Sequence, residues 1–367
     1  MVTNMDFRTE IKNYIPEALE NAKIYVYGMG SDWRYIRRLY RNLAGICLED
    51  QVDYIVDRNA GKNEHLGKAK VITPDKIDIS DCVIFIATHF FEQEIGIELE
   101  GQGLKPRNHF YDSFYLVSVL YEYLFRRSTA FKNRHNGERC FIIGNGPSLK
   151  AEDLEKLHEN NVTTIAMNNI NRIFEGTVWR PTYYVACDYF VIENIDNAIG
   201  TCPCPRFINL KYAQMLDDFS PDNTFFYMEN DLVLFLNHIA VPRVSDNLYE
   251  INSGGSVIFI AMQLAFYMGF SEIYLLGADN SYIAAKNYNG EVVYEQSLAH
   301  NHFVADSSYF SNNSKTGFYS QPFLYQLSAA FRSADEYAKE HGVILRNATR
   351  GGKLDMIERI SFDEMVL

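Results

Sequence analysis

The segment Cys140-Phe-Ile-Ile-Gly-Asn-Gly-Pro-Ser148 places a short apolar strand directly before a glycine turn. Gly144 and Gly146 allow the backbone to approach a ligand closely, and the Pro-Ser pair predicts a helix start whose free amides Ser148 caps. The positive end of such a helix favours an anion such as phosphate, and Asn145 adds a hydrogen-bond donor and acceptor. A tight strand–helix turn without a ligand fits the same residues equally well, and the local pattern leaves both interpretations open.

Strands and helices alternate along the chain beyond this turn. Apolar strands are expected at Thr163–Met167, Tyr183–Ala186 and Glu272–Leu276, and an apolar helix is expected at Ser256–Met268. Strands that alternate with helices indicate a parallel sheet covered by helices on its faces. We therefore predict an α/β fold with a mostly parallel, Rossmann-like sheet.

The N-terminal part shows the same alternation on a smaller scale. The strand Lys23–Tyr27 ends at a glycine turn, but Trp33 stands where a dinucleotide-binding fingerprint has its third glycine. This departure favours a structural role over cofactor binding. A change from apolar to basic residues marks a boundary near residue 130. The sequence thus predicts a smaller Rossmann-like domain with a helical connector over residues 1–130 and a larger domain over residues 138–367.

Composition restricts the class of protein. A net charge of -13 argues against a general affinity for nucleic acid and leaves at most a peripheral contact with a membrane. The six cysteines form no CxxC pair, so neither a zinc site nor a disulfide framework is expected and no metal is assigned. The N-terminus lacks an apolar signal core, and the longest apolar run, Val257–Phe270, is shorter than the roughly 20 residues of a membrane span. We predict a cytoplasmic protein.

The segment Phe141–Leu149 resembles the opening of the bacterial Cst-type sialyltransferases. It also resembles the wider family that contains the motility accessory factors, which glycosylate flagellin, and the archaeal MptE-type 6-hydroxymethylpterin diphosphokinases. Further segments match in the same order: Ala166-Met-Asn-Asn169, Tyr184-Val-Ala-Cys-Asp188, Ser253-Gly-Gly-Ser-Val257, Gly269–Asp279 and Asn347-Ala-Thr-Arg-Gly-Gly352. One departure is Asp188, because the sialyltransferases have an asparagine near this position. The ordered motifs indicate the superfamily and a sialyltransferase-like sheet, but they do not identify a substrate.

The resemblance implies a donor site at the carboxyl edge of the sheet. Its candidate residues are Gly144, Asn145, Gly146, Ser148, Asn168, Asp188, Ser253 and Asp279. Tyr282 and Tyr288 resemble a tyrosine pair that hydrogen-bonds the departing nucleotide phosphate in the sialyltransferases, although their offset from the aspartate differs by one residue. His302 is the candidate general base, with His300 as its alternative, because the sialyltransferases carry their base on the same long loop. All four also fit ordinary loop residues. We expect the polar stretch 280–320 to form a lid over the donor.

These features predict a glycosyltransferase. It would move a sugar from a CMP- or UDP-linked donor to a cell-surface glycan or a protein, without a tightly bound cofactor, and a homo-oligomer is allowed. One alternative is an ATP-dependent 6-hydroxymethylpterin diphosphokinase, in which Asp188 and Asp279 are candidate ligands for Mg²⁺. Another is a non-catalytic nucleotide-binding subunit of polysaccharide assembly. The additional N-terminal domain favours the glycan interpretation, because a pterin kinase has no evident need of it.

Overall fold

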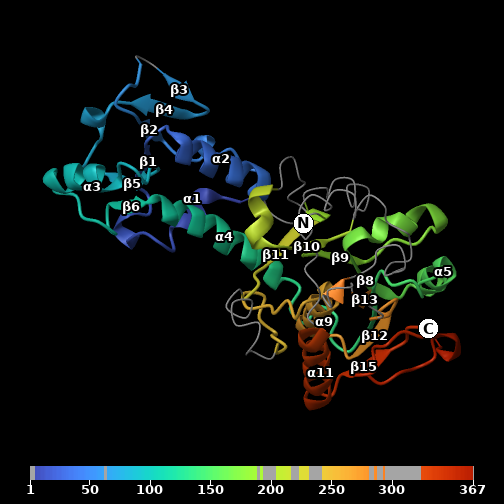
Figure 1. Cartoon of the computed structure of the whole chain (residues 1–367). Coiled ribbons are helices and arrows are strands. Elements are labelled where there is room, and N and C mark those ends of the chain that lie inside the picture. The colour runs from blue at the N-terminus through green and yellow to red at the C-terminus, as the bar shows by residue number, and fades with distance from the viewer. Residues whose placement is uncertain are drawn as a thin grey trace. The chain divides into compact units, whose positions relative to one another are not determined.

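The protein has an α/β structure divided into two compact units. The computed structural model describes residues 5–61, 64–187, 191–192, 204–215, 223–230, 242–280, 285–286, 292–293 and 324–366. Among the described residues, the first unit ends at Arg127 and the second begins at Ser128. Each unit is built on its own mostly parallel sheet with helices packed beside it (Figure 1), which confirms the predicted fold class.

The first unit contains a six-stranded sheet with the order β3-β4-β2-β1-β5-β6, in which β3 runs antiparallel to β4 and the other pairs are parallel. Its strands are β1 (Lys23–Tyr27), β2 (Tyr54–Val56), β3 (His65–Leu66), β4 (Ala69–Ile72), β5 (Cys82–Ile86) and β6 (Phe110–Asp112). Its helices are α1 (Phe7–Ile11), α2 (Ser31–Ala44), α3 (Glu92–Gly101) and α4 (Ser113–Thr129), with 3-10 turns at Glu17–Leu19, Leu48–Asp50 and Pro74–Lys76.

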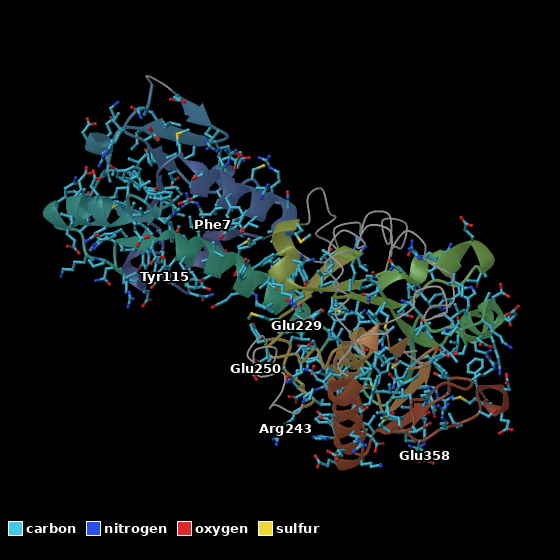
Figure 2. The ribbon with its side chains drawn as sticks, in the orientation of Figure 1. Phe7, Tyr115, Glu229, Arg243, Glu250 and Glu358 are labelled. Carbon is cyan, nitrogen blue, oxygen red and sulfur yellow. The ribbon has the colours of Figure 1, made fainter. Side chains whose placement is uncertain are left out.

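Aromatic side chains fill the core of the first unit. The Phe7 ring, labelled in Figure 2, is fully buried and lies 6.2 Å from the Phe85 ring of β5 and 5.7 Å from the Tyr40 ring of α2. Trp33 of α2 is also buried. The side chain that replaces the third glycine of a nucleotide fingerprint therefore lies in the core of this unit.

The second unit contains a seven-stranded, fully parallel sheet with the order β11-β10-β9-β8-β7-β12-β15. Its strands are β7 (Arg139–Ile143), β8 (Thr163–Met167), β9 (Tyr183–Ala186), β10 (Arg206–Asn209), β11 (Thr224–Tyr227), β12 (Glu272–Leu276) and β15 (Ile344–Asn347). Its helices are α5 (Ala151–Glu159), α9 (Val257–Tyr267) and α11 (Leu324–Glu340), with 3-10 segments at Asn168–Gly176, Leu210–Met215 and Phe362–Glu364. A short antiparallel pair, β13 (Ala285–Lys286) and β14 (Val292–Val293), completes the described elements.

The strand order reverses direction between β7 and β12. From β7 the chain proceeds through β8, β9 and β10 to β11, and it then returns to place β12 on the other side of β7. In open parallel sheets, ligands bind at the carboxyl ends of the strands where the order reverses. The glycine turn that follows β7 and the turn that follows β12 therefore flank the expected ligand position.

Both faces of this sheet are covered. Helices α9 and α11 pack against each other (Figure 1), and α9 contacts β7, β8 and β9. On the opposite face, the Phe141 ring of β7 lies 5.8 Å from the Phe362 ring, and the Lys156 ammonium of α5 lies 5.0 Å from that same ring. Burial on both faces explains why β7 has a continuous apolar run instead of alternating polar and apolar residues.

Candidate functional site

The turns after β7 and β12 pack backbone against backbone. The Gly144 amide donates to the Leu276 carbonyl oxygen and the Gly146 amide to the Gly277 carbonyl oxygen, each at 2.8 Å. A Cβ on Gly144 would overlap the Gly277 oxygen, and a Cβ on Gly146 would lie 2.6 Å from that oxygen and overlap the Asp279 carboxylate. The two glycines are thus required by the contact between the turns. Their expected close approach to a ligand stays a prediction.

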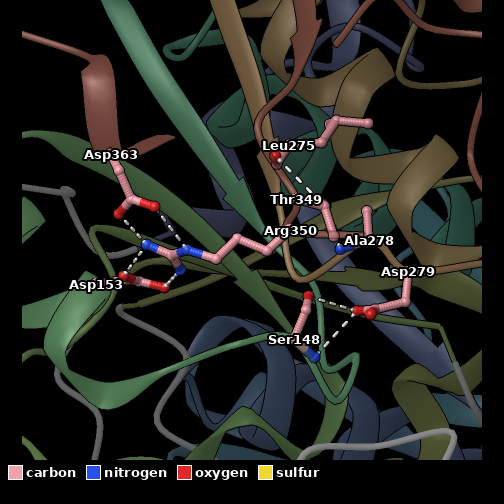
Figure 3. Close-up of polar contacts among 8 residues, drawn as sticks. All are labelled: Ser148, Asp153, Leu275, Ala278, Asp279, Thr349, Arg350 and Asp363. Atoms are coloured by element: carbon pink, nitrogen blue, oxygen red, sulfur yellow. Dashed lines mark hydrogen bonds and ion pairs between the residues drawn. The ribbon is translucent and has the colours of Figure 1, made fainter. Parts of the chain in front are cut away.

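Ser148 and Asp279 connect the same two turns through their side chains (Figure 3). The Ser148 hydroxyl donates to Asp279 Oδ2 at 2.8 Å, and the Ser148 amide lies 3.4 Å from the same oxygen. Helix α5 begins later than predicted, at Ala151 with Lys150 as its N-cap, so the expected capping role of Ser148 is wrong. The physical reason is that Ser148 lies in a turn closed by the Leu149 amide and the Gly146 carbonyl oxygen.

The turn Asn347-Ala-Thr-Arg-Gly-Gly352 supports the β12 turn from the other side. The Thr349 hydroxyl accepts from the Ala278 amide at 3.0 Å, and the Lys353 amide donates to the Asp279 carbonyl oxygen at 2.7 Å. Asn347 is fully buried and holds the turn closed through the Thr349 amide and the Leu354 carbonyl oxygen. Asp279 is only 8% exposed as a result.

Arg350 joins this turn to the start of α5. Its guanidinium binds both Asp153 oxygens, one of them at 2.9 Å, and forms a second pair with Asp363 at 2.5 Å and 3.1 Å (Figure 3). The Arg350 guanidinium lowers the pKa of Asp363, and the hydrogen bonds that Arg350 donates to Asp363 and Asp153 raise its own pKa. The ion-paired cluster fixes the helix that follows the glycine turn.

Two asparagine side chains lie at the ends of β7 and β8. The Asn145 amide donates to the Met167 carbonyl oxygen at 3.1 Å, which ties the β7 turn to the end of β8. Asn168 has a left-handed φ of 45°, and its carbonyl oxygen accepts from the Tyr184 hydroxyl at 2.8 Å. The side-chain oxygens of Asn145 and Asn168 are buried and have no hydrogen-bond partner among the described residues. Buried acceptors are nearly always satisfied, so this pair indicates a place where a ligand or water donates.

The turn Ser253-Gly-Gly-Ser256 precedes α9 at the same edge of the sheet. β12 starts shortly after α9 ends, so the N-terminus of α9 lies at the carboxyl edge. Gly254 and Gly255 have φ values of 54° and 76°, and the Ser256 side chain caps α9 by accepting from the Ile258 amide at 3.2 Å. A capped helix N-terminus presents a partial positive charge to an anion.

Gln263 of α9 holds the start of this turn in place. It is fully buried, and its side-chain oxygen accepts from the amides of Ser245 and Asn252, each at 3.1 Å. Its nitrogen donates to the Asn252 carbonyl oxygen at 2.7 Å and to the Phe259 carbonyl oxygen at 3.1 Å. The polar residue that interrupts the apolar run is therefore a positioning residue for the turn, a role that sequence reasoning missed.

The structure places the described candidates at one edge of the second sheet, after β7, β8 and β12 and before α9. These are Gly144, Asn145, Gly146, Ser148, Asn168, Ser253 and Asp279. The remaining candidates lie outside the described residues; they are Asp188, Tyr282, Tyr288, His300 and His302. Sequence reasoning also missed the contributions of Thr349, Arg350 and Asp153, although the Asn347–Gly352 motif was a usable signal for the first two.

Two kinds of feature are absent from the part of the chain that the structure describes. No helix there is long and apolar enough to cross a membrane. No group of three or more histidine, cysteine or acidic side chains there is arranged to hold a metal ion.

A family model matches one part of the chain. Residues 117–284 match a family model described as 6-hydroxymethylpterin diphosphokinase MptE-like, which confirms the resemblance to this superfamily. Among solved structures, the chain is similar to a MAf glycosyltransferase from Magnetospirillum magneticum AMB-1, with 13% identity and a TM-score of 0.40. That alignment covers 100% of this chain and 63% of the other, so the chain spans less than two thirds of that protein. No curated protein sequence matched.

Proposed function

We propose that this MptE-like chain is a transferase that binds a nucleotide-activated sugar and transfers the sugar to a glycan or protein acceptor. The observation that carries the proposal is the pair of unsatisfied side-chain oxygens on Asn145 and Asn168 at the reversal of the strand order. A nucleotide supplies what these acceptors need, because its base amine and its ribose hydroxyls are hydrogen-bond donors.

The donor phosphate would bind at the turn before α9. This turn contains Ser253, and its two left-handed glycines leave backbone amides at the positive end of the helix. Contacts between α9 and the strands β7, β8 and β9 support a position beside the two asparagines. In this arrangement Gly144, Gly146, Ser148 and Asp279 shape the base of the site, and Asp188 is proposed as a further donor ligand.

The reaction itself would use residues from the stretch 280–320. We assign stabilisation of the leaving phosphate to Tyr282 and Tyr288, and deprotonation of the acceptor hydroxyl to His302 or His300, from the resemblance to the sialyltransferases. Phenolic hydroxyls stabilise developing phosphate charge by donating hydrogen bonds. A histidine near neutral pKa accepts the proton of the attacking hydroxyl.

Pyrophosphoryl transfer from ATP to a pterin is the second candidate function, and the matched family description favours it. It would require Mg²⁺, for which Asp188 and Asp279 are the proposed carboxylates. Asp279 is a poor ligand in its described setting, because it is almost fully buried and one oxygen already accepts from Ser148. This geometry supports the glycosyl-transfer proposal. A non-catalytic nucleotide-binding subunit would share the same donor site.

Nucleotide binding to Asn145→Ala tests the site. Titration calorimetry with CMP, UDP, GDP and ATP identifies the nucleotide, and the variant is then compared with wild type. Loss of a hydrogen bond of about 1–1.5 kcal/mol predicts roughly tenfold weaker binding. Asn160→Ala is the matched control, since the Asn160 amide also donates to a backbone oxygen, that of Lys156, at 2.8 Å. Equal affinity in wild type and Asn145→Ala would refute the assignment.

Chelation separates the candidate functions. Sugar transfer or donor hydrolysis that persists in EDTA supports the proposed glycosyltransferase. Activity that vanishes in EDTA, returns with Mg²⁺ and consumes ATP with a pterin would support the diphosphokinase. Nucleotide binding without turnover of either substrate would support the non-catalytic subunit.

A further inference from the structure

A polar cluster of residues not assigned to the nucleotide lies at the carboxyl ends of β10 and β11. It consists of Asn209, Lys211, Tyr212 and Glu229, and we call it the β10–β11 cluster. Asn209 is the last residue of β10, and Lys211 and Tyr212 follow it in the next 3-10 segment. Glu229 follows β11 and is labelled in Figure 2. None of these residues is used by the proposed nucleotide site.

Asn209 has an unsatisfied buried donor. The residue is 1% exposed, and its side-chain oxygen accepts from the Lys211 amide at 3.1 Å, which directs the side chain toward the following loop. Its Nδ2 has no hydrogen-bond partner among the described residues. A buried amide donor left without a partner indicates that something outside the described residues accepts from it.

The other members of the cluster form an ion pair beside an aromatic ring. The Lys211 ammonium lies 2.6 Å from Glu229 Oε2 and 5.1 Å from the centre of the Tyr212 ring. The Glu229 side chain is 5% exposed, whereas that of Lys211 is 35% exposed. Burial raises the pKa of Tyr212, so its phenol stays protonated at neutral pH. The cluster thus combines a cation, a carboxylate, an amide donor and a phenol.

Glu229 is held beside the turn that precedes α9. It pairs with Ile251, the Asn230 amide donates to the Ile251 carbonyl oxygen at 2.9 Å, and the Ile251 amide donates to the Met228 carbonyl oxygen at 2.9 Å. Ile251 is two residues before Ser253. The cluster therefore adjoins the proposed phosphate position.

The charges of the cluster select the class of ligand. An anion would meet the Glu229 carboxylate, and a divalent cation would meet the Lys211 ammonium, so each is disfavoured at the paired site. A neutral polyhydroxyl group fits the cluster, because its hydroxyls donate to the Glu229 carboxylate and accept from the side-chain amide of Asn209. The Tyr212 ring adds an apolar surface with a polar edge, as sugars require.

We propose that the β10–β11 cluster binds the sugar portion of the donor and so determines which sugar is accepted. The inference rests on the proposed function. Neighbouring strands lie about 4.8 Å apart, so the ends of β7 and β10, three strands along, are separated by roughly 14 Å. An extended nucleotide sugar covers such a span, with its base over Asn145, its phosphate at the α9 turn and its sugar at Asn209.

The test compares the affinities of a nucleotide and its sugar-bearing form. Titration calorimetry is performed with UDP against UDP-N-acetylglucosamine and with GDP against GDP-mannose, since both sugars are neutral, and the pair that wild type binds is used. Variants are Asn209→Leu and Glu229→Gln; the second keeps an acceptor for Lys211 and therefore the fold. Arg139→Met is the matched control, because Arg139 pairs with Glu272 at 2.6 Å at the amino edge of the same sheet.

The expected result is a selective loss. Both cluster variants should bind the nucleotide with an affinity within about twofold of that of wild type. The additional affinity that the sugar contributes should fall roughly tenfold. The control should lose neither. Two outcomes would overturn the subsite while leaving the nucleotide site intact. One is an unchanged affinity for the nucleotide sugar in both cluster variants. The other is an equal loss of affinity for the nucleotide and for the nucleotide sugar. Absence of nucleotide binding to wild type would instead refute the proposed function, and the subsite with it.

Discussion

Replacing Gln263 with leucine tests whether one buried amide positions the turn before α9. Leucine has nearly the same volume but cannot hydrogen-bond. The substitution leaves the amides of Ser245 and Asn252 and the Asn252 carbonyl oxygen without their partner. Phe259 is less affected, because its carbonyl oxygen retains the helical hydrogen bond.

The magnitude follows from burial. An unsatisfied buried donor or acceptor costs about 1–3 kcal/mol. Asn252 is buried and supplies two such groups, while Ser245 is half-buried and can bind water instead. The two unsatisfied groups of Asn252 should destabilise the second unit by about 3 kcal/mol, after part of their cost is offset by the free energy gained from burying the apolar leucine. For a unit of this size about 2–4 °C is lost per kcal/mol, so the melting temperature should fall by about 6–12 °C.

Circular dichroism melting measures the change, and calorimetric titration with nucleotide measures the accompanying loss of affinity. Met262→Leu is the control, since Met262 is equally buried on the same helix and the exchange conserves volume. A melting temperature for Gln263→Leu no lower than that of Met262→Leu would refute the reasoning. Reduced stability with unchanged nucleotide affinity would show that the turn has no part in binding the ligand.

Three further predictions concern the glycine turn, the Arg350 cluster and the proposed base. Gly146→Ala should destabilise the protein by about 1–3 kcal/mol in urea unfolding and abolish nucleotide binding, because the added Cβ overlaps the Asp279 carboxylate; wild-type behaviour would contradict the observed contact between the turns. Arg350 lowers the pKa of Asp363 below its ordinary value of 3.8, so the stabilisation is present above that pH and is lost as the pH falls toward the lower folded-state pKa. When the pH is lowered from 5 to about 3, the urea midpoint of Arg350→Met should therefore fall less than that of wild type. An identical fall in both proteins would contradict this. His302→Ala should abolish transfer while keeping donor affinity, and full activity would return the role of base to His300.

The centre of the second unit could be predicted from the sequence. The strands Thr163–Met167, Tyr183–Ala186 and Glu272–Leu276 have the predicted bounds. They are mostly apolar runs between turn residues, the pattern of strands that are buried on both faces. Their alternation with helices therefore indicated the parallel sheet and its carboxyl edge.

Other features depended on tertiary contacts that no local pattern contains. β10 begins with Arg206 and ends with Asn209, both buried, and two polar residues in a four-residue strand conceal its apolar pattern. Ser148 has the residue type of a helix cap, but an aspartate 131 positions away takes its hydroxyl. Gln263 interrupts an apolar run without revealing that its partners are backbone groups outside the helix. In each case the decisive partner is distant in sequence.

The pairing of β7 with β12 constrains the order in which the second sheet can form during translation. Arg139 at the start of β7 and Glu272 at the start of β12 are 133 residues apart, yet they form an ion pair. During synthesis the glycine turn leaves the ribosome long before the strand that it packs against. The edge of β7 stays uncovered in the nascent chain until β12 emerges, and unpaired edges of this kind are prone to aggregate. On the proposed function, nucleotide stabilises the protein only after that pairing, so nucleotide added during translation should protect full-length chains and not those that stop before β12.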